Sequence, residues 1–362
     1  MKHWIACLSV LIVVCFQSSI LAAAPSASLP VRGLNLGAPK PEEVPQMVRF
    51  IREALPKEGV NLLVLEFDYR YQYKTHPEVV DADALSSADV KALVEACRAA
   101  GVRLIPLINL LGHQSWAETT FGLLRAHPEF DETPEKYPAN KNIYCRSYCP
   151  LHPDLHKIVF DLVDELAEVC EADTVHVGMD EVFILADPDC PRCKSRNKAE
   201  LFAQEVRTLH DHLLSTRREM WMWGDRFLDG GTTGLGEWEA SENGTAAAIQ
   251  MVPRDIVICD WHYDAVPATA PYFAVEGFRV LYAPWRKTEV ALGELDLIRA
   301  ARAHADPTIA PRLIGILQTS WTGPGEFIRA YYGEASTPAP GTEAREAAAT
   351  FKALFSAIRA TP

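Results

Sequence analysis

Asp180 and Glu181 are adjacent acids at the end of an apolar run, in the segment TVHVGMDEVF (residues 174–183). Val175 and Val177 alternate as in a buried strand, so the two carboxyl groups follow directly on a strand end. Neighbouring like charges raise each other's pKa and cost free energy. Such a pair is either a solvated turn or a catalytic site in which one acid donates a proton while the other stays ionised.

The direction of these two side chains depends on the backbone. Successive side chains of a regular strand point to opposite faces, so Asp180 and Glu181 can share a pocket only where the strand is ending. Gly178 fits such a position, because glycine adopts backbone angles that other residues disfavour. The remaining elements must then bring binding groups to the same strand end.

The strand before Asp180 is one of eight short apolar runs that alternate with amphipathic helical stretches. These runs are residues 31–37, 60–67, 102–109, 174–178, 219–223, 255–260, 278–283 and 312–318. Helices are predicted over 41–56, 86–101, 153–170, 196–217 and 286–304. Eight βα units in order predict an α/β fold, a single-domain (β/α)8 TIM barrel. An open doubly wound sheet would need a glycine-rich turn after the first strand, and RGLNLGAPK is not one.

The segments before and after the predicted barrel do not show its alternation of strands and helices. Lys2, an apolar stretch over residues 5–16 and three alanines at 22–24 predict a signal peptide over residues 1–24, too short to span a membrane. We therefore expect an exported protein, periplasmic or extracellular, with no membrane segment after cleavage. The barrel domain is expected over 25–333. Residues 334–362 are expected to form a Pro-rich link and a C-terminal helix that packs on the barrel.

The composition limits which classes of binding partner are expected, and the cysteine positions limit which cross-links are expected. The 362 residues are 48% hydrophobic and 23% charged with a net charge of −13, which disfavours nucleic acid or an anionic membrane as a partner. Two of the nine cysteines belong to the predicted signal. Cys145, Cys149, Cys190 and Cys193 lie in two loops, with spacing that suits two disulfides or one structural zinc site. In an exported chain, disulfides are favoured.

In a TIM barrel, function is located at the carboxyl ends of the strands. Four tryptophans fall at successive strand ends, and aromatic side chains around carboxylates suit a sugar, whose C–H faces stack on rings. The candidate residues at the eight ends are Arg32, Asn35, Glu66, Asp68, Tyr69, Asn109, His113, Trp116, His176, Asp180, Glu181, Trp223, Asp225, Asp260, Trp261, Tyr263, Trp285, Gln318 and Trp321.

Three segments resemble one known family. HVGMDEV resembles the HxGxDE signature of glycoside hydrolase family 20, the β-N-acetylhexosaminidases. RGL in the first strand and IPLINLLGH in the third are similar to that family's sugar-binding Arg-Gly and strand-3 segments. The similarity covers about residues 31–330 and is greatest to the hexosaminidase D-like branch, which also lacks an extra N-terminal domain.

The resemblance implies a retaining, substrate-assisted hydrolysis of terminal β-linked N-acetylhexosamine, without a cofactor or metal. Asp180 would orient the substrate's 2-acetamido group, and Glu181 would serve as general acid and then base. The negative charge of Asp180 would help to raise the pKa of Glu181.

The same resemblance assigns binding roles. The predicted substrate-binding residues are Arg32 for sugar hydroxyls, His113 and His176 beside the acids, Trp223, Trp261, Trp285 and Trp321 as walls, Asp225, and Tyr263 for the acetamido oxygen. His176 is equally well interpreted as a core histidine, and a polar chain from His113 to Asp68 or Glu66 is expected. The distal glutamate that many members carry after the last strand is missing or replaced by Glu326.

Two other functions compete with this interpretation. A non-catalytic glycan-binding barrel is disfavoured because both acids are intact. A metal-dependent hydrolase built on His113, His176 and Asp180 ranks last, because the sequence has no HxH or HExxH pair. Hydrolysis of N-acetyl substrates with and without a chelator separates the three.

Overall fold

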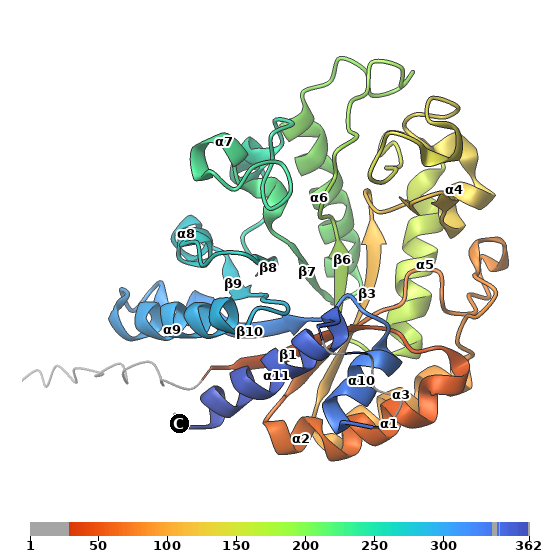
Figure 1. The fold of residues 1–362 in the computed structure, drawn as a ribbon. Coiled ribbons are helices and arrows are strands. Elements are labelled where there is room, and N and C mark those ends of the chain that lie inside the picture. The colour runs from red at the N-terminus through yellow and green to blue at the C-terminus, as the bar shows by residue number, and fades with distance from the viewer. Residues whose placement is uncertain (1–28, 335–338, 340, 361–362) are drawn as a thin grey trace, which may run out of the picture.

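Eight parallel strands close into a barrel in the computed structural model of this protein, in the spatial order β1-β10-β9-β8-β7-β6-β3-β2 (Figure 1). The barrel strands are β1 (Val31–Gly37), β2 (Leu62–Glu66), β3 (Arg103–Leu110), β6 (Thr174–Gly178), β7 (Glu219–Trp223), β8 (Val257–Asp260), β9 (Arg279–Tyr282) and β10 (Leu313–Thr319). A small antiparallel pair, β4 (Ser115–Trp116) and β5 (Thr119–Thr120), stands outside it. The predicted single-domain (β/α)8 barrel is therefore confirmed.

The structure describes residues 29–334, 339 and 341–360. The predicted signal peptide lies outside these residues, as does most of the Pro-rich link. Within the described part of the chain, no helix combines the length and the apolar character needed to span a bilayer.

Helices alternate with the strands and surround the barrel (Figure 1). The α-helices are α1 (Val44–Glu53), α2 (Leu55–Glu58), α3 (Ser87–Ala100), α4 (Gly122–Ala126), α5 (Leu155–Val169), α6 (Lys198–Ser215), α7 (Gly230–Thr233), α8 (Thr269–Glu276), α9 (Thr288–His304), α10 (Pro324–Tyr332) and α11 (Glu343–Ala360). Short 3-10 helices are η1 (Pro41–Glu43), η2 (Pro77–Val79), η3 (Pro128–Phe130), η4 (Pro138–Asn140), η5 (Asp225–Phe227), η6 (Ala246–Met251) and η7 (Ala310–Arg312).

Two apolar layers hold the barrel together. Alternate strand residues such as Leu62, Val64, Ile105 and Leu107 form a cluster inside the barrel, which includes three tryptophans from β7 and the end of β8. The residues between them on each strand join a larger cluster that also contains the inner faces of the helices. This division follows from the period of two along a strand, which sends neighbouring side chains to opposite faces.

The last helix packs against the barrel's outer layer. Phe351 of α11 makes ring contacts with Phe50, Phe327 and Tyr331 of α1 and α10. The Gln318 amide at the end of β10 donates a hydrogen bond to the Ala347 carbonyl (2.9 Å). Figure 1 shows α11 beside α10. The C-terminal helix is thus anchored directly at a strand end.

Candidate active site

The chain turns sharply after β6, and this turn aims both acids into one cavity. Gly178, Met179 and Glu181 have φ values of 68°, 74° and 47°, in the left-handed region. At Gly178 a Cβ would lie 2.5 Å from the Asn109 side-chain oxygen, so glycine is required there for two reasons. The interrupted strand geometry allows Asp180 and Glu181 to line the same cavity.

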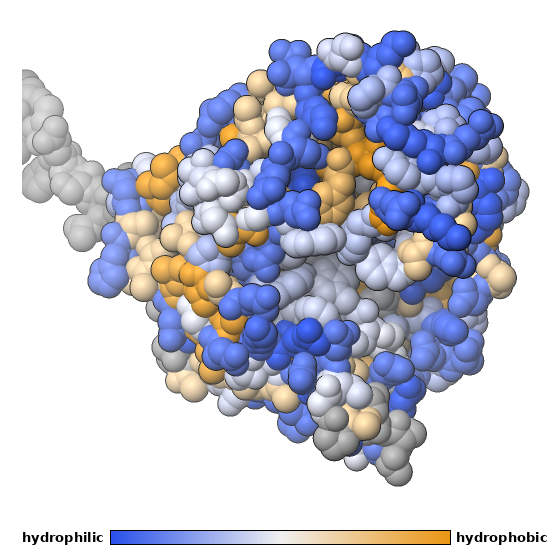
Figure 2. Space-filling view, turned by 45° about the horizontal axis from the view of Figure 1, so that its top comes forward, coloured by the Kyte–Doolittle hydropathy of each residue, from blue (hydrophilic) through white to orange (hydrophobic). Residues whose placement is uncertain are grey.

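The cavity has a volume of about 650 Å³ and opens at the carboxyl ends of the strands. Figure 2 shows a hollow on the face that comes forward, surrounded largely by pale, weakly polar side chains. The lining residues are Glu66, Asp68, Tyr69, Arg70, Asp81, Asn109, His113, Trp116, Phe121, Tyr144, Asp180, Glu181, Trp261, Tyr263, Trp285, Trp321 and Glu343. The volume and the aromatic content suit one sugar ring with its substituents.

His113 links the two acids. Its Nε2 atom lies 3.3 Å from Asp180 Oδ2 and 3.0 Å from Glu181 Oε2. Burial alone would lower the pKa of His113, but the charge of Asp180 and contacts with both carboxyl groups raise it well above 6.5. Burial raises the pKa of Asp180, whereas the nearby His113 lowers it, with a net decrease. Asp180 is therefore ionised, and His113 carries its counter-charge.

The second oxygen of Asp180 is free to bind a ligand. Asp180 Oδ1 is buried and has no hydrogen-bond partner among the described residues. An unpaired buried acceptor is unfavourable by about 1–3 kcal/mol. An incoming N–H donor would remove that penalty.

Glu181 is held by its backbone and faces a tyrosine. Its amide donates a hydrogen bond to Asp225 Oδ2 (2.9 Å), and Asp225 in turn pairs with the Arg226 guanidinium at 2.7 Å. Burial raises the pKa of Asp225 to about 6, against the lowering effect of Arg226. Tyr144 lies beside the Glu181 carboxyl group, and burial raises the tyrosine pKa. Asp225 therefore positions the Glu181 backbone from behind the cavity.

An aromatic wall stands beside the acids. The Tyr263 ring lies 5.0 Å from that of Trp261 and 5.3 Å from that of Trp285. The Trp321 indole N–H donates a hydrogen bond to the Tyr263 hydroxyl (2.7 Å), which leaves the hydroxyl proton available for a ligand. Trp321 is 40% exposed and forms part of the cavity mouth.

Acidic groups from the end of β2 also line the cavity. Burial and the charge of Asp68 raise the pKa of Glu66 to about 8. Burial also raises the pKa of Asp68, whose two oxygens accept hydrogen bonds from the backbone and side chain of Asn109 (2.8 and 3.3 Å). The expected chain from His113 to these acids is replaced by the direct contacts of His113 with Asp180 and Glu181.

Four predicted binding residues do not line the cavity: Asp225, which lies behind it, and Arg32, His176 and Trp223. Arg32 lies at the amino end of β1, where it donates hydrogen bonds to the Gly59 and Leu29 carbonyls (both 2.8 Å) and does not line the cavity. His176 and Trp223 are buried against each other, with ring centroids 4.5 Å apart.

His176 is accordingly a core histidine. Burial lowers its pKa to about 3, and its Nδ1 accepts the Gly178 N–H. Trp223 packs beneath Trp321, with ring centroids 5.7 Å apart, and supports the wall from inside the barrel.

Other residues of the cavity were missing from the prediction. Arg70, just after β2, is an arginine that lines the cavity, whereas Arg32 does not. The Arg70 guanidinium donates hydrogen bonds to the Glu66 and Ala38 carbonyls. Tyr144 comes from a long loop without periodicity. Glu343, in the first turn of α11, reaches the cavity, whereas Glu326 lies in the first turn of α10 outside the lining. Only its place at a strand end would have identified Arg70.

Among the residues that the structure describes, two groups of side chains could hold a metal ion. His113, Asp180 and Glu181 place three donor atoms within 4.8 Å of one another, and so do Cys149, Cys190 and Cys193. The predicted disulfides are absent, because all seven cysteines in the described residues are free thiols. Cys145 stands apart from the other three, with its thiol 3.6 Å from the Glu181 carbonyl oxygen.

Comparison with known proteins agrees with this geometry. Residues 64–290 match the family model "Glycosyl hydrolase family 20, catalytic domain". A beta-hexosaminidase of Akkermansia muciniphila is 26% identical over 114 residues, 31% of this chain and 22% of that protein. The chain thus spans less than a quarter of the length of this curated relative.

Solved structures of similar fold come from the same family. A Flavobacterium johnsoniae chitobiase has a TM-score of 0.62 and 16% identity over 91% of this chain and 51% of its own. A Vibrio harveyi exo β-N-acetylglucosaminidase, solved with N-acetylglucosamine, has a TM-score of 0.61 and 17% identity over 90% of this chain and 54% of its own. At these identities the likeness concerns the fold alone, but the family model covers well over half of the chain. The protein therefore belongs to glycosyl hydrolase family 20, with the catalytic barrel of that family.

Proposed function

We propose that this protein is a β-N-acetylhexosaminidase that releases terminal β-linked N-acetylglucosamine or N-acetylgalactosamine with retention of configuration. The observation that carries the proposal is the pair of neighbouring acids, Asp180 and Glu181, facing one aromatic-walled cavity with His113 between them. Family membership supports it, as does the N-acetylglucosamine bound to the Vibrio harveyi enzyme.

The arrangement of the acids favours a nucleophile supplied by the substrate. A usual retaining glycosidase places two carboxylates on opposite sides of the scissile bond, roughly 5 Å apart. Asp180 and Glu181 are chain neighbours and approach the sugar from one side. Glu66 has its pKa raised to about 8, so at neutral pH it is protonated and a poor nucleophile. The acetamido oxygen of the substrate then remains as the attacking group.

The proposed reaction has two balanced steps. The acetamido oxygen attacks the anomeric carbon while Glu181 donates its proton to the leaving glycosidic oxygen, which gives an oxazolinium ion and a free alcohol. Glu181, now ionised, takes a proton from water as the water attacks the anomeric carbon. The ring opens to the β-configured sugar, and Glu181 is protonated again.

Asp180 and Tyr263 would bind the two ends of the acetamido group. Asp180 Oδ1, buried without a partner in the described structure, suits the N–H and the positive charge that develops there. The Tyr263 hydroxyl accepts from Trp321 and keeps its own proton for the acetamido oxygen. Trp261 and Trp285 would pack on the acetamido methyl and the sugar face.

We further propose that the protein is exported. The support comes from the sequence of residues 1–24, with a basic start, an apolar stretch and a run of alanines. N-terminal sequencing of the secreted or periplasmic protein tests it, and a mature start at Pro25 is expected.

Hydrolysis of chromogenic N-acetylglucosaminides, N-acetylgalactosaminides and plain glucosides tests the function. We expect turnover of the N-acetyl substrates, no measurable turnover of glucosides, and no effect of a chelator. A Glu181→Gln variant should lose activity. Binding of N-acetylhexosamine without any turnover would indicate a glycan-binding barrel. Turnover lost on chelation and restored by added metal would indicate a required metal, and its retention in Cys193→Ser would assign that metal to His113, Asp180 and Glu181 rather than to the three cysteines.

A further inference from the structure

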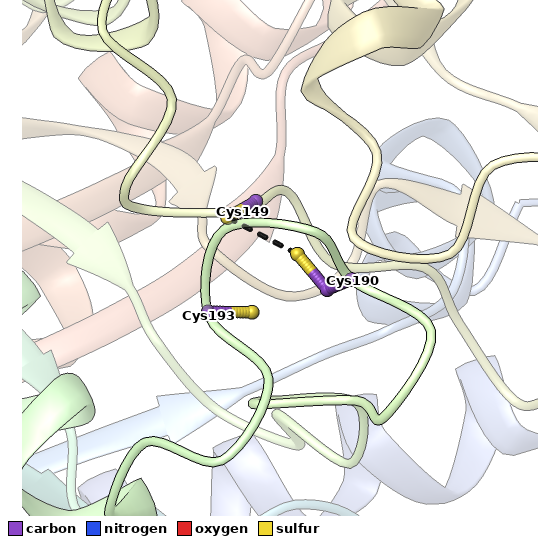
Figure 3. Close-up of side chains that lie close together, drawn as sticks. All are labelled: Cys149, Cys190 and Cys193. Atoms are coloured by element: carbon purple, nitrogen blue, oxygen red, sulfur yellow. Dashed lines mark hydrogen bonds between the residues drawn. The ribbon is translucent and has the colours of Figure 1, made fainter.

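Three buried cysteines from two separate loops meet outside the catalytic cavity. Cys149 belongs to the loop before α5, and Cys190 and Cys193 belong to the loop between β6 and α6 (Figure 3). All three are almost fully buried and unbridged. We propose that these cysteines bind a structural zinc ion that ties the two loops together.

The distances between the thiols fit a metal site. The Cys149 and Cys190 sulfurs are 3.5 Å apart, and all three sulfurs lie within 4.8 Å of one another. Zinc–sulfur bonds of about 2.3 Å in a tetrahedron require sulfurs about 3.8 Å apart. The Cys190-x-x-Cys193 spacing is a common way for a loop to supply two zinc ligands.

Glu132 is the side chain that the structure offers for the fourth position. It is buried, and its Oε1 accepts the Asp187 N–H (2.7 Å), while its Oε2 has no hydrogen-bond partner within the described chain. Glu132 contacts the Cys193 thiol, so its carboxyl group lies next to the cluster, outside the set of donors that all lie within 4.8 Å of one another. Carboxylate oxygens are accepted zinc ligands.

The chemistry of the group favours a cation over a single disulfide. A bridge to Cys193 would leave one buried thiol unpaired, and a bridge between Cys149 and Cys190 would leave the Cys193 thiol beside the Glu132 carboxyl group, whose Oε2 has no hydrogen-bond partner among the described residues. A dication satisfies the three sulfurs and that oxygen together. The Arg192 guanidinium contacts Cys149 and would offset part of the negative charge of the liganded site.

The loops that zinc would tie also shape the catalytic cavity. Tyr144, which lines the cavity, lies shortly before Cys149 in the chain, and the loop that carries Cys190 starts at the catalytic acids. Other links join the same loops, such as the ion pair of Lys136 with Asp187 (2.8 Å). A zinc ion here would therefore hold cavity walls without touching the substrate.

Metal analysis of the full-length purified protein tests the proposal directly. After expression with added Zn²⁺ and dialysis into metal-free buffer, we expect about one zinc per chain. Cys193→Ser should lose the zinc, whereas the matched Cys97→Ser change, at a buried cysteine in α3, should retain it. As a ligand, Glu132 should matter more than a residue that only supports one, so Glu132→Gln should weaken zinc binding by at least about 10- to 100-fold.

Further measurements keep the outcome decisive if Cys193→Ser does not fold. Wild-type protein loaded with Co²⁺ should show the visible absorption of a tetrahedral cobalt–thiolate centre. The His113→Gln variant should keep its zinc, which would show that the zinc is not bound by His113, Asp180 and Glu181. Titration in denaturant with chelator should find all seven thiols of residues 25–362. Five thiols, or metal-free protein after zinc loading, would overturn the proposal whatever the glycosidase activity.

Discussion

The charge of Asp180 is the feature on which the proposed mechanism depends most, and Asp180→Asn removes it with little change of shape. The Asp180 carboxylate is buried, and its Oδ2 lies 3.3 Å from His113 Nε2. Its Oδ1 has no hydrogen-bond partner among the described residues. A unit charge about 3 Å from a developing acetamido cation is worth at most about 5.5 kcal/mol at an effective dielectric constant of 20. The lower figure is about 3 kcal/mol, the upper value for one hydrogen bond to a charged group.

These figures convert to a loss of about 10²- to 10⁴-fold in kcat/KM for Asp180→Asn. The assay is steady-state hydrolysis of nitrophenyl N-acetylglucosaminide and N-acetylgalactosaminide. Asp264→Asn makes the same chemical change at an exposed aspartate paired with Lys287 (2.8 Å) and should stay within about twofold of wild type, as surface pairs contribute little. The reasoning is refuted if Asp180→Asn keeps more than a third of wild-type activity while Asp264→Asn behaves normally.

Four further outcomes follow from the same geometry. Glu181→Gln should reduce kcat by about 10²- to 10⁴-fold on a disaccharide, and by less on a nitrophenyl glycoside, whose leaving group needs no proton; equal losses on both substrates would argue against a general acid. Tyr263→Phe should reduce kcat/KM for N-acetyl substrates by about 10- to 100-fold with unchanged melting temperature, the value of one hydrogen bond to a charged intermediate. Trp321→Ala should raise KM more than it lowers kcat, measured by initial rates, because the ring is half exposed at the cavity mouth. His176 stays neutral in the fold down to about pH 3, while the unfolded chain protonates it below 6.5, so its contribution to stability is present above pH 6.5 and is lost as the pH falls. In urea denaturation, wild type should lose about 2.3 kcal/mol more than His176→Asn between pH 6.5 and 4.5, and parallel pH curves would contradict this.

The strands of the barrel could be predicted from the sequence, because each is a short apolar run bounded by polar residues. Three predicted ranges, 31–37, 174–178 and 219–223, agree with β1, β6 and β7 at both ends. The helices α8 and α10 had not been predicted; α8 has only eight residues and α10 follows a Gly-Pro start within a loop-like stretch. Strand periodicity is thus a stronger signal here than short helices.

Site residues could be predicted where their position at the end of a strand determines their location. They could not be predicted where contacts between distant parts of the chain determine it. The acids and the aromatic side chains at the carboxyl ends of β8, β9 and β10 do meet in the cavity. Arg32 is five positions too early on β1 and lies at its amino end, a distinction that a short motif does not carry. Tyr144 reaches the cavity from a loop whose path no local pattern specifies. The cluster of three cysteines could not be separated from Cys145 by spacing alone.

The contribution of α11 to the cavity has a consequence for how the protein matures. Glu343 forms part of the wall, and Arg286 after β9 pairs with it at 2.7 Å, so the last helix closes a gap that the eight strands leave open. During synthesis, β1 can meet β10 before residues 343–360 have left the ribosome. A nascent barrel would therefore be topologically closed before α11 adds its part of the cavity wall.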